Sequence, residues 1–395
     1  MQIKSAAMNG VLLLLSTTLN SVAAEDELLR GSQIPERIHP IKRIYGKENA
    51  HVRAAIHEIE TESTQYFRTG IRADPSFEVP YANHPLRQRN RELITAEEES
   101  ESAFKPMRIT IVTDSLDSVR DANNGDKIDF VKGEVLKRMA HFLTDTLSVV
   151  PVLGPLKIQT GELWKGLYCG HPDFTRVPED HISSGVADTD VILYVSASSS
   201  PKFCGATTLA VAIACNVDDF DRPTAGSINF CLDRIYLDSD GTAHESVIQD
   251  NVDVAIHETA HVFGMSSNSY RFFRDPQGEP RTSRPFKATS VECVTGKNLT
   301  VTLPDANTLQ FLTAENGQRF AAIVTPRVRT VARNQFNCHD LEGGQLENQP
   351  TGSTSCYGNH WDERLYYPES LSGIISPNEM FFSPLSKSNL DGISY

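Results

Sequence analysis

The sequence predicts an α+β fold in which a mixed sheet precedes one long helix. Three short segments, 108–113, 190–195 and 226–230, have the length and the apolar patterning of strands. Another segment, 242–263, contains neither Gly nor Pro and carries apolar residues that can form one buried helical face. With 395 residues, 39% of them hydrophobic, the chain can bury a sizeable core around these elements.

The elements ahead of the long helix follow from the spacing of their apolar residues. In 108–113 apolar and polar side chains alternate, which predicts a strand with one buried face. Residues 130–147 carry apolar side chains at helical spacing and predict a helix. The continuous apolar run at 190–195 is bounded by polar residues and predicts a buried strand, and 226–230 predicts another.

The long helix has a start signal and a stop signal. Thr242, with Glu245 three positions later, predicts a capping box at the first turn. Gly264 follows the apolar pattern directly and predicts where the helix has ended. We expect the buried face to include Val247, Ile248, Val254, Ala255 and Val262.

The N-terminus predicts export. Lys4 precedes an apolar run at 11–15, and Val22-Ala23-Ala24 offers a small-residue cleavage site, so residues 1–24 are predicted to be a signal peptide rather than a buried helix. The apolar run is too short to span a bilayer, which takes about 20 residues. Since no second long apolar run follows, we expect a secreted chain without a transmembrane segment.

The next segment, 25–104, is charged, rich in Arg, Glu and His, and free of Cys. It predicts a pro-region, with a solvated arm as the less favoured alternative. The net charge of the whole chain is −14, which argues against a nucleic-acid partner because phosphate binding needs a concentrated basic surface.

The cysteines agree with an oxidising compartment. In a secreted protein most of them should pair, and an odd number leaves one free or paired between chains. No two have CxxC spacing, so a structural zinc knot is not expected. The seven are Cys169, Cys204, Cys215, Cys231, Cys293, Cys338 and Cys356.

The candidate chemistry lies near the end of the long helix, in His257-Glu258-Thr259-Ala260-His261. Residues four apart share a helix face, so both imidazoles can reach one metal ion, and zinc accepts such nitrogen ligands. Glu258 is then placed to take a proton from a zinc-bound water. The alternative is two partly exposed helix histidines without a metal.

A catalytic zinc site takes three protein ligands. A short-spaced third histidine would stand at position 267, which is a serine. The remaining candidates are distant: His339, which follows a cysteine in a polar stretch, and His360, which has small residues before it and an aromatic residue after it. Composition does not choose between them.

Several motifs together resemble the leishmanolysin family of zinc peptidases. The segment from His257 through Gly264 is similar to the family's HExxHxxG helix, and the much later His360-Trp361-Asp362-Glu363 is similar to its HWE-type motif. The resemblance extends over roughly 105–395. Further similar segments are 193–197, 204–210, 221–231, 332–338, 346–349 and 390–395.

This resemblance implies one Zn²⁺ per chain, with His257, His261 and His360 as ligands, Glu258 as general base and Gly264 as the turn that ends the helix. It implies a zincin-type core with an N-terminal catalytic part at 105–265, an inserted middle subdomain at 266–359, and a C-terminal part of the catalytic region at 360–395. The implied function is that of a secreted zinc-dependent endopeptidase acting on polypeptides.

The chain departs from the family pattern in three places. Leu371 stands where the family has a methionine in a turn beneath the metal; because leucine has a similar volume, we expect activity to survive. Arg37 replaces a pro-region cysteine before Ile38-His39, so latency is lost or comes from another group such as His39, which is more simply a solvated loop residue. Third, the sequence stops where family members often continue into a Cys-rich C-terminal domain, and we expect this to leave one cysteine, Cys338 or Cys356, without its partner.

Two further alternatives concern function: a zinc-binding or adhesion protein without catalysis, and a zinc hydrolase that acts on another amide or ester, which the resemblance disfavours. A catalytically impaired zinc-binding or adhesion protein could retain the fold, although metal binding alone does not require Glu258. Tyr366 and Tyr367 could donate to a developing oxyanion, but packing is the expected role of such amphipathic aromatics. We expect His171, His181, His244 and His339 to be surface or cap residues.

Overall fold

The computed structural model describes residues 2–3, 104–205, 208–350, 355–367, 369–373, 380–390 and 392–393. The predicted signal peptide beyond residue 3 and the predicted pro-region up to residue 103, with Arg37 and His39, lie outside the described residues.

The main sheet has four strands in the order β3-β7-β9-β8. Strand β7 (Val191–Ser196) pairs in parallel with β3 (Ile109–Val112) and with β9 (Pro223–Phe230), whereas β8 (Ala210–Val217) pairs antiparallel with β9. Every residue of β7 and β9 is buried, as expected for the central strands of a sheet. The strands predicted at 108–113, 190–195 and 226–230 are therefore confirmed.

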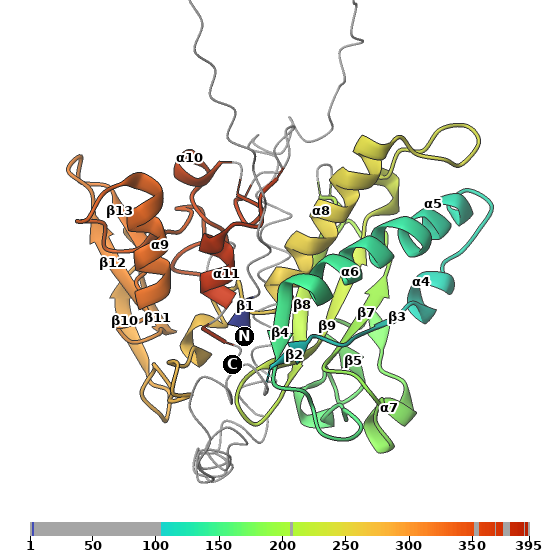
Figure 1. The fold of residues 1–395 in the computed structure, drawn as a ribbon, viewed down its shortest axis with the longest axis horizontal. Coiled ribbons are helices and arrows are strands. Elements are labelled where there is room, and N and C mark those ends of the chain that lie inside the picture. The colour runs from blue at the N-terminus through green and yellow to red at the C-terminus, as the bar shows by residue number, and fades with distance from the viewer. Residues whose placement is uncertain are drawn as a thin grey trace, which may run out of the picture.

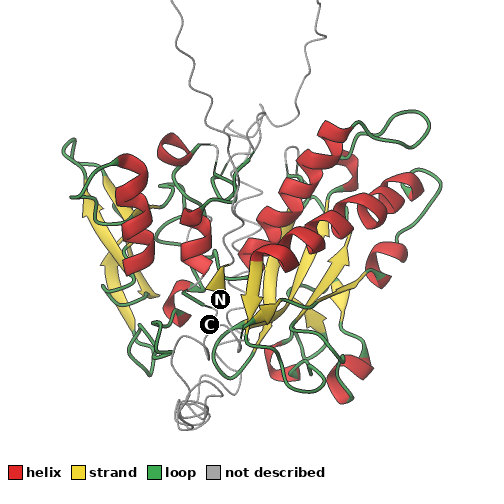
Figure 2. Ribbon diagram, viewed as in Figure 1, coloured by secondary structure: helices red, strands yellow, loops and turns green. Residues whose placement is uncertain are grey.

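Two helical segments lie on one side of this sheet (Figures 1 and 2). The first is continuous through α5 (Gly125–Phe130), the π-helical turn η6 (Val131–Val135) and α6 (Leu136–Thr146), so the helix predicted at 130–147 is confirmed and begins earlier. The second is α8 (Glu245–Val262), which contacts β8, β9 and α6.

The predicted capping box of α8 is wrong. The N-cap is His244, whose ring accepts a hydrogen bond from the Ser246 amide. The Thr242 hydroxyl instead donates to Asp240 Oδ1 in the turn before the helix, at 2.6 Å. Since that hydroxyl is already engaged, the helix begins two residues later than the pattern suggests.

The C-terminal elements gather on the opposite side of the molecule from the main sheet (Figure 1). Strands β10 (Ala288–Glu292) and β11 (Asn298–Thr302) form a hairpin. A second sheet has the order β12-β13-β14, with helix α9 (Pro326–Phe336) between its last two strands in sequence. The other elements here are β12 (Leu309–Thr313), β13 (Arg319–Ile323), β14 (Gly344–Gln345), η9 (Tyr270–Phe272), α10 (Glu363–Tyr366) and α11 (Pro384–Leu390).

Short elements complete the N-terminal half. A small sheet has the order β1-β4-β2, and β5 pairs with β6. The bounds are β1 (Gln2–Ile3), β2 (Lys105–Pro106), α4 (Asp114–Asp117), β4 (Leu147–Val149), η7 (Thr160–Glu162), β5 (Tyr168–Cys169), β6 (Thr175–Arg176), α7 (Glu179–Ser183) and η8 (Leu232–Arg234).

One hydrophobic core joins the two halves. Its buried members run from Met107, ahead of β3, to Ile393, and they include Ala255 of α8, Val328 of α9 and Trp361. The mixed α and β structure predicted from the sequence is thus confirmed. Within the described part of the chain, no helix combines the length and the hydrophobicity needed to cross a bilayer.

Three disulfides lie within the described residues: Cys169–Cys215, Cys204–Cys231 and Cys293–Cys356. Cys338 is a free thiol, which is one of the two outcomes expected for the odd cysteine. Disulfides of this number are typical of an oxidising compartment.

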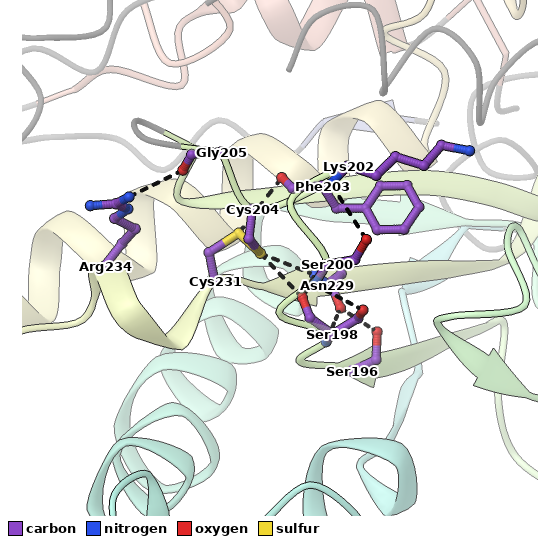
Figure 3. The surroundings of a disulfide bond; sticks show 10 residues. All are labelled: Ser196, Ser198, Ser200, Lys202, Phe203, Cys204, Gly205, Asn229, Cys231 and Arg234. Carbon is purple, nitrogen blue, oxygen red and sulfur yellow. Dashed lines mark hydrogen bonds between the residues drawn. A yellow bond between two sulfur atoms is a disulfide. The ribbon is translucent and has the colours of Figure 1, made fainter. Parts of the chain in front are cut away.

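The disulfide Cys204–Cys231 holds the loop after β7 against the end of β9 (Figure 3). Asn229 of β9 reinforces this junction, because its Oδ1 accepts hydrogen bonds from Ser196 Oγ at 2.9 Å and from the Ser198 amide at 2.6 Å. The same side chain donates to the Ser198 carbonyl. The disulfide and these hydrogen bonds together hold the end of β9 against the loop that follows β7.

Candidate metal centre

Helix α8 and a distant loop bring three imidazoles together. His257 and His261 lie one turn apart on α8, and their Nε2 atoms are 3.1 Å apart. His360, which follows β14, places its Nε2 atom 3.2 Å from that of His261, although the two residues are 99 positions apart. Among the described residues, no other set of three His, Cys, Asp or Glu side chains converges in this way.

Each ring is held through its other nitrogen. His257 Nδ1 lies 2.7 Å from the Ser370 carbonyl oxygen, His261 Nδ1 lies 2.6 Å from the Met265 carbonyl oxygen, and His360 Nδ1 lies 2.6 Å from Glu347 Oε1. Because these oxygens accept, each Nδ1 donates and each Nε2 presents its lone pair to the other two. Metal-binding histidines are oriented by this kind of partner.

The spacing of these nitrogens suits a zinc ion. Zinc binds histidine nitrogen at about 2.0–2.1 Å with tetrahedral angles, which places two such nitrogens about 3.3 Å apart. The observed separations of 3.1 and 3.2 Å are close to this value. Three lone pairs facing one another repel unless a cation lies between them, so the donor set fits a metal ion.

The two helix histidines are uncharged at neutral pH. Burial disfavours the imidazolium form of His257, and the neighbouring His360 adds repulsion, so its pKa is lowered to about 3. Burial, together with His257 and His360, also holds the pKa of His261 well below its ordinary value. Neutral imidazole is the form that binds metal, so neither residue has to lose a proton first.

Glu258, between the two helix histidines in sequence, is a buried carboxyl group. Burial raises its pKa to about 7, and this effect outweighs the opposing influence of His360. A carboxyl group that titrates near the working pH can accept a proton and later give it up. Next to a metal-bound water such a group can act as a general base.

Gly264 redirects the chain immediately after α8. Its φ of +111° is strained for any residue with a Cβ, and a Cβ atom here would lie 2.7 Å from Ile393 Cδ1. The turn brings the carbonyl of Met265 back to His261 Nδ1. The predicted turn at Gly264 is confirmed, and it orients a ring of the cluster.

Replacing Gly264 with alanine is expected to lower the free energy of unfolding by about 3 kcal/mol, because backbone strain and the contact with Ile393 both oppose the new methyl group. Denaturant unfolding measures this effect. Gly296→Ala is the matched control: its φ is +77° but no heavy atom lies within 4 Å of the new Cβ, so only the backbone cost of about 1 kcal/mol should appear. Equal effects at the two sites would contradict a tightly packed turn.

Leu371 lies in the turn that supports both parts of the cluster. Its side chain is fully buried and its carbonyl accepts a hydrogen bond from the Trp361 amide at 2.9 Å. The preceding residue, Ser370, supplies the carbonyl that binds His257. Leu371 therefore fills a buried apolar position in a short segment that contacts His257 through Ser370 and contacts Trp361, the residue after His360, through its own carbonyl.

The other candidates from the sequence lie outside the cluster. His339 is exposed, so the alternative third ligand is not brought to the site. Tyr366 packs against Phe336 and Trp361, while its hydroxyl oxygen accepts from the Gln345 amide, as the packing interpretation expects. Tyr367 is exposed.

The remaining histidines have structural roles, but not all of those expected. His244 caps α8, as expected. His171 packs against Phe203 with ring centroids 4.8 Å apart, and the His181 ring is hydrogen-bonded to the Tyr194 hydroxyl at 2.9 Å. These two are therefore packing residues rather than freely solvated ones.

Sequence reasoning assigned no role to the three groups that orient the rings. Two of them, the Ser370 and Met265 carbonyls, belong to the backbone and leave no signal in side-chain identity. Glu347 is one of 51 acidic residues, and its burial is the property that sets it apart. Gly358 is a sequence signal for this contact, because a residue with a Cβ at that position would collide with the Glu347 side chain.

Comparison with known proteins gives a consistent result. The family model described as leishmanolysin matches residues 118–393 of the chain. A leishmanolysin-like peptidase of Caenorhabditis elegans is 30% identical over 359 residues, 78% of this chain and 51% of that protein. A leishmanolysin homolog of Crithidia fasciculata is 25% identical over 310 residues, 76% and 39% of the respective chains.

A shorter match is found to a vertebrate protein. The ciliated left-right organizer metallopeptidase of Xenopus laevis is 30% identical over 200 residues, which are 49% of this chain and 23% of that protein. The chain spans about half the length of the Caenorhabditis relatives that it matches.

Proposed function

Because the chain belongs to the leishmanolysin family of metallopeptidases, we propose that it is a secreted zinc-dependent endopeptidase that hydrolyses peptide bonds in polypeptides. The observation that carries this proposal is the convergence of three imidazole Nε2 atoms, two of them on the helix that also carries the buried carboxyl group of Glu258. Two helix residues and one distant residue supply the nitrogens, and each ring is oriented by an oxygen partner.

His257, His261 and His360 would hold one zinc ion per chain. Three neutral nitrogen donors with one open position are the ligand set of catalytic zinc sites. When bound, zinc supplies Lewis-acid chemistry, making water acidic near neutral pH and polarising a carbonyl oxygen.

Glu258 performs the proton transfers. Its carboxylate accepts a proton from the attacking water and then passes that proton to the nitrogen of the leaving amine. Glu258 follows His257 directly on α8, so the base and the two helix ligands belong to the same helix. Burial of Glu258 limits exchange of this proton with bulk solvent.

The fold proposed for this activity is a zincin-type core. It comprises 105–265, with the main sheet and α8, and 360–395, with His360 and Leu371. Residues 266–359 are proposed as an inserted middle subdomain, supported by the separate β12-β13-β14 sheet in that range. The predicted signal peptide and the three disulfides support secretion.

Zinc content and peptide hydrolysis test the proposal together. We expect residues 25–395, or 105–395 after removal of the proposed pro-region, to bind one zinc per chain and to cleave casein. A chelator should abolish cleavage and added zinc should restore it. Chelator-resistant cleavage, or a folded chain that binds no zinc, would contradict the proposal.

A further inference from the structure

A buried carboxylate lies against the third imidazole of the cluster. Glu347 is 3% exposed, and its Oε1 atom lies 2.6 Å from His360 Nδ1 and 3.2 Å from the Asn359 amide nitrogen. An ionised carboxylate can only accept hydrogen bonds. His360 Nδ1 must then donate, which leaves Nε2 unprotonated and directed at His257 and His261.

The backbone fixes this contact from both sides. The Glu347 amide donates to the His360 carbonyl at 2.9 Å, and the Gly358 amide donates to the Glu347 carbonyl at 3.2 Å. A Cβ on residue 358 would lie 2.0 Å from Glu347 Cγ, so only glycine lets the two chain segments approach this closely. The carboxylate is therefore built into the loop that carries His360.

The same loop is anchored to the metal-binding helix and to the turn at Leu371. Asn359 Oδ1 accepts a hydrogen bond from the Ser267 amide, just beyond α8, at 2.8 Å. On the other side of His360, the Trp361 amide donates to the Leu371 carbonyl. The residues on both sides of His360 are thus held by hydrogen bonds, and the Glu347 carboxylate orients the His360 ring itself.

The three ring partners differ in charge. His257 and His261 donate to neutral backbone carbonyls, whereas His360 donates to a carboxylate. A negative charge one hydrogen bond away from a ligand raises the basicity of that ligand and partly neutralises a bound dication. The negative charge therefore strengthens metal binding by His360, the ligand from the distant loop, and not by the two histidines of α8.

We propose that Glu347 is the positioning residue that fixes the tautomer of His360 and raises the zinc affinity of the cluster. The inference rests on the proposed function for the identity of the metal ion. It assigns the carboxylate a role through His360, without direct contact between Glu347 and the metal.

Glu347→Gln tests this role because it keeps the shape and a hydrogen-bond acceptor but removes the charge. We expect zinc affinity, measured by competition with a chromophoric chelator, to fall about 10-fold, and that of Glu347→Ala to fall by up to about 100-fold. The absorption spectrum of the cobalt-substituted chain should change, since it reports how His360 coordinates. The stability of the metal-free Gln variant should stay close to that of the unaltered chain.

Glu342→Gln is the matched control. Glu342 lies in the same connecting segment, is 53% exposed, and is 3.7 Å from Arg329, so removal of its charge should leave zinc affinity unchanged. A second comparison places Glu347→Gln in a chain that already carries His360→Ala. Because the proposed effect acts through His360, it should disappear in that background.

Zinc affinity of Glu347→Gln within about twofold of the unaltered chain, with an unchanged cobalt spectrum, would overturn the proposal. An undiminished effect in the His360→Ala background would also overturn it, because the carboxylate would then act elsewhere. Failure of the proposed function is distinguishable, since it appears in the unaltered chain as an absence of bound zinc or as zinc without peptide cleavage.

Discussion

Glu258→Gln is expected to reduce peptide hydrolysis by about 10²–10⁴-fold, which is the typical contribution of a positioned proton-transfer group. Glutamine has nearly the same shape, but its amide cannot accept the proton of the attacking water. The zinc content should not change, because the three imidazoles and their oxygen partners remain in place. Initial rates on a quenched fluorescent peptide, with metal analysis of the same sample, measure both quantities.

Glu245→Gln is the control for this substitution. Glu245 belongs to the same helix but is exposed in its first turn, where it pairs with Arg138. Its replacement should leave hydrolysis within about twofold, since surface ion pairs contribute little. A Glu258→Gln chain that retains more than about a tenth of the activity would show that Glu258 is not the base. A zinc-binding or adhesion protein without catalysis would keep its function in this variant.

His360→Ala is expected to weaken zinc binding by more than about 100-fold and to abolish hydrolysis. Zinc sites with four protein ligands contribute about 10–16 kcal/mol, or roughly 3 kcal/mol per ligand, and this corresponds to about two orders of magnitude in affinity. Loss of the ring also leaves the buried Glu347 carboxylate without its principal partner. Isothermal titration of zinc into the metal-free variant measures the change.

His339→Ala separates the two candidates for the third ligand that the sequence leaves open. His339 is exposed and lies outside the cluster, so its replacement should preserve both zinc affinity and hydrolysis. If the two variants lost zinc to the same extent, the geometric cluster would not be the binding site.

The local part of this site could be predicted from the sequence because a helix imposes its own geometry. Four-residue spacing on α8 is sufficient to bring His257 and His261 together. Gly264 likewise predicts a turn, since few other residues adopt its backbone conformation. Strand β7 could be predicted for a different reason: it is buried along its whole length, and this leaves an apolar run in the sequence.

The non-local part could not be predicted in this way. The carbonyl that orients His257 belongs to a residue 113 positions away, and spacing does not reveal such contacts. Glu347 and His360 meet because two loop segments pair, not because their side chains form a pattern. At the start of α8 a local rule failed, because Thr242 had a competing partner in the preceding turn.

The distribution of the three imidazoles over the chain bears on the fate of a damaged molecule. Two lie on α8 and the third lies 99 residues beyond His261, after the β12-β13-β14 sheet. Under the proposed function, a fragment that ends before His360, or one that begins after His261, would therefore carry only part of the ligand set. Cleavage that separates the α8 ligands from His360 would then inactivate the enzyme, whereas removal of the proposed pro-region, 25–104, would leave all three imidazoles on one fragment.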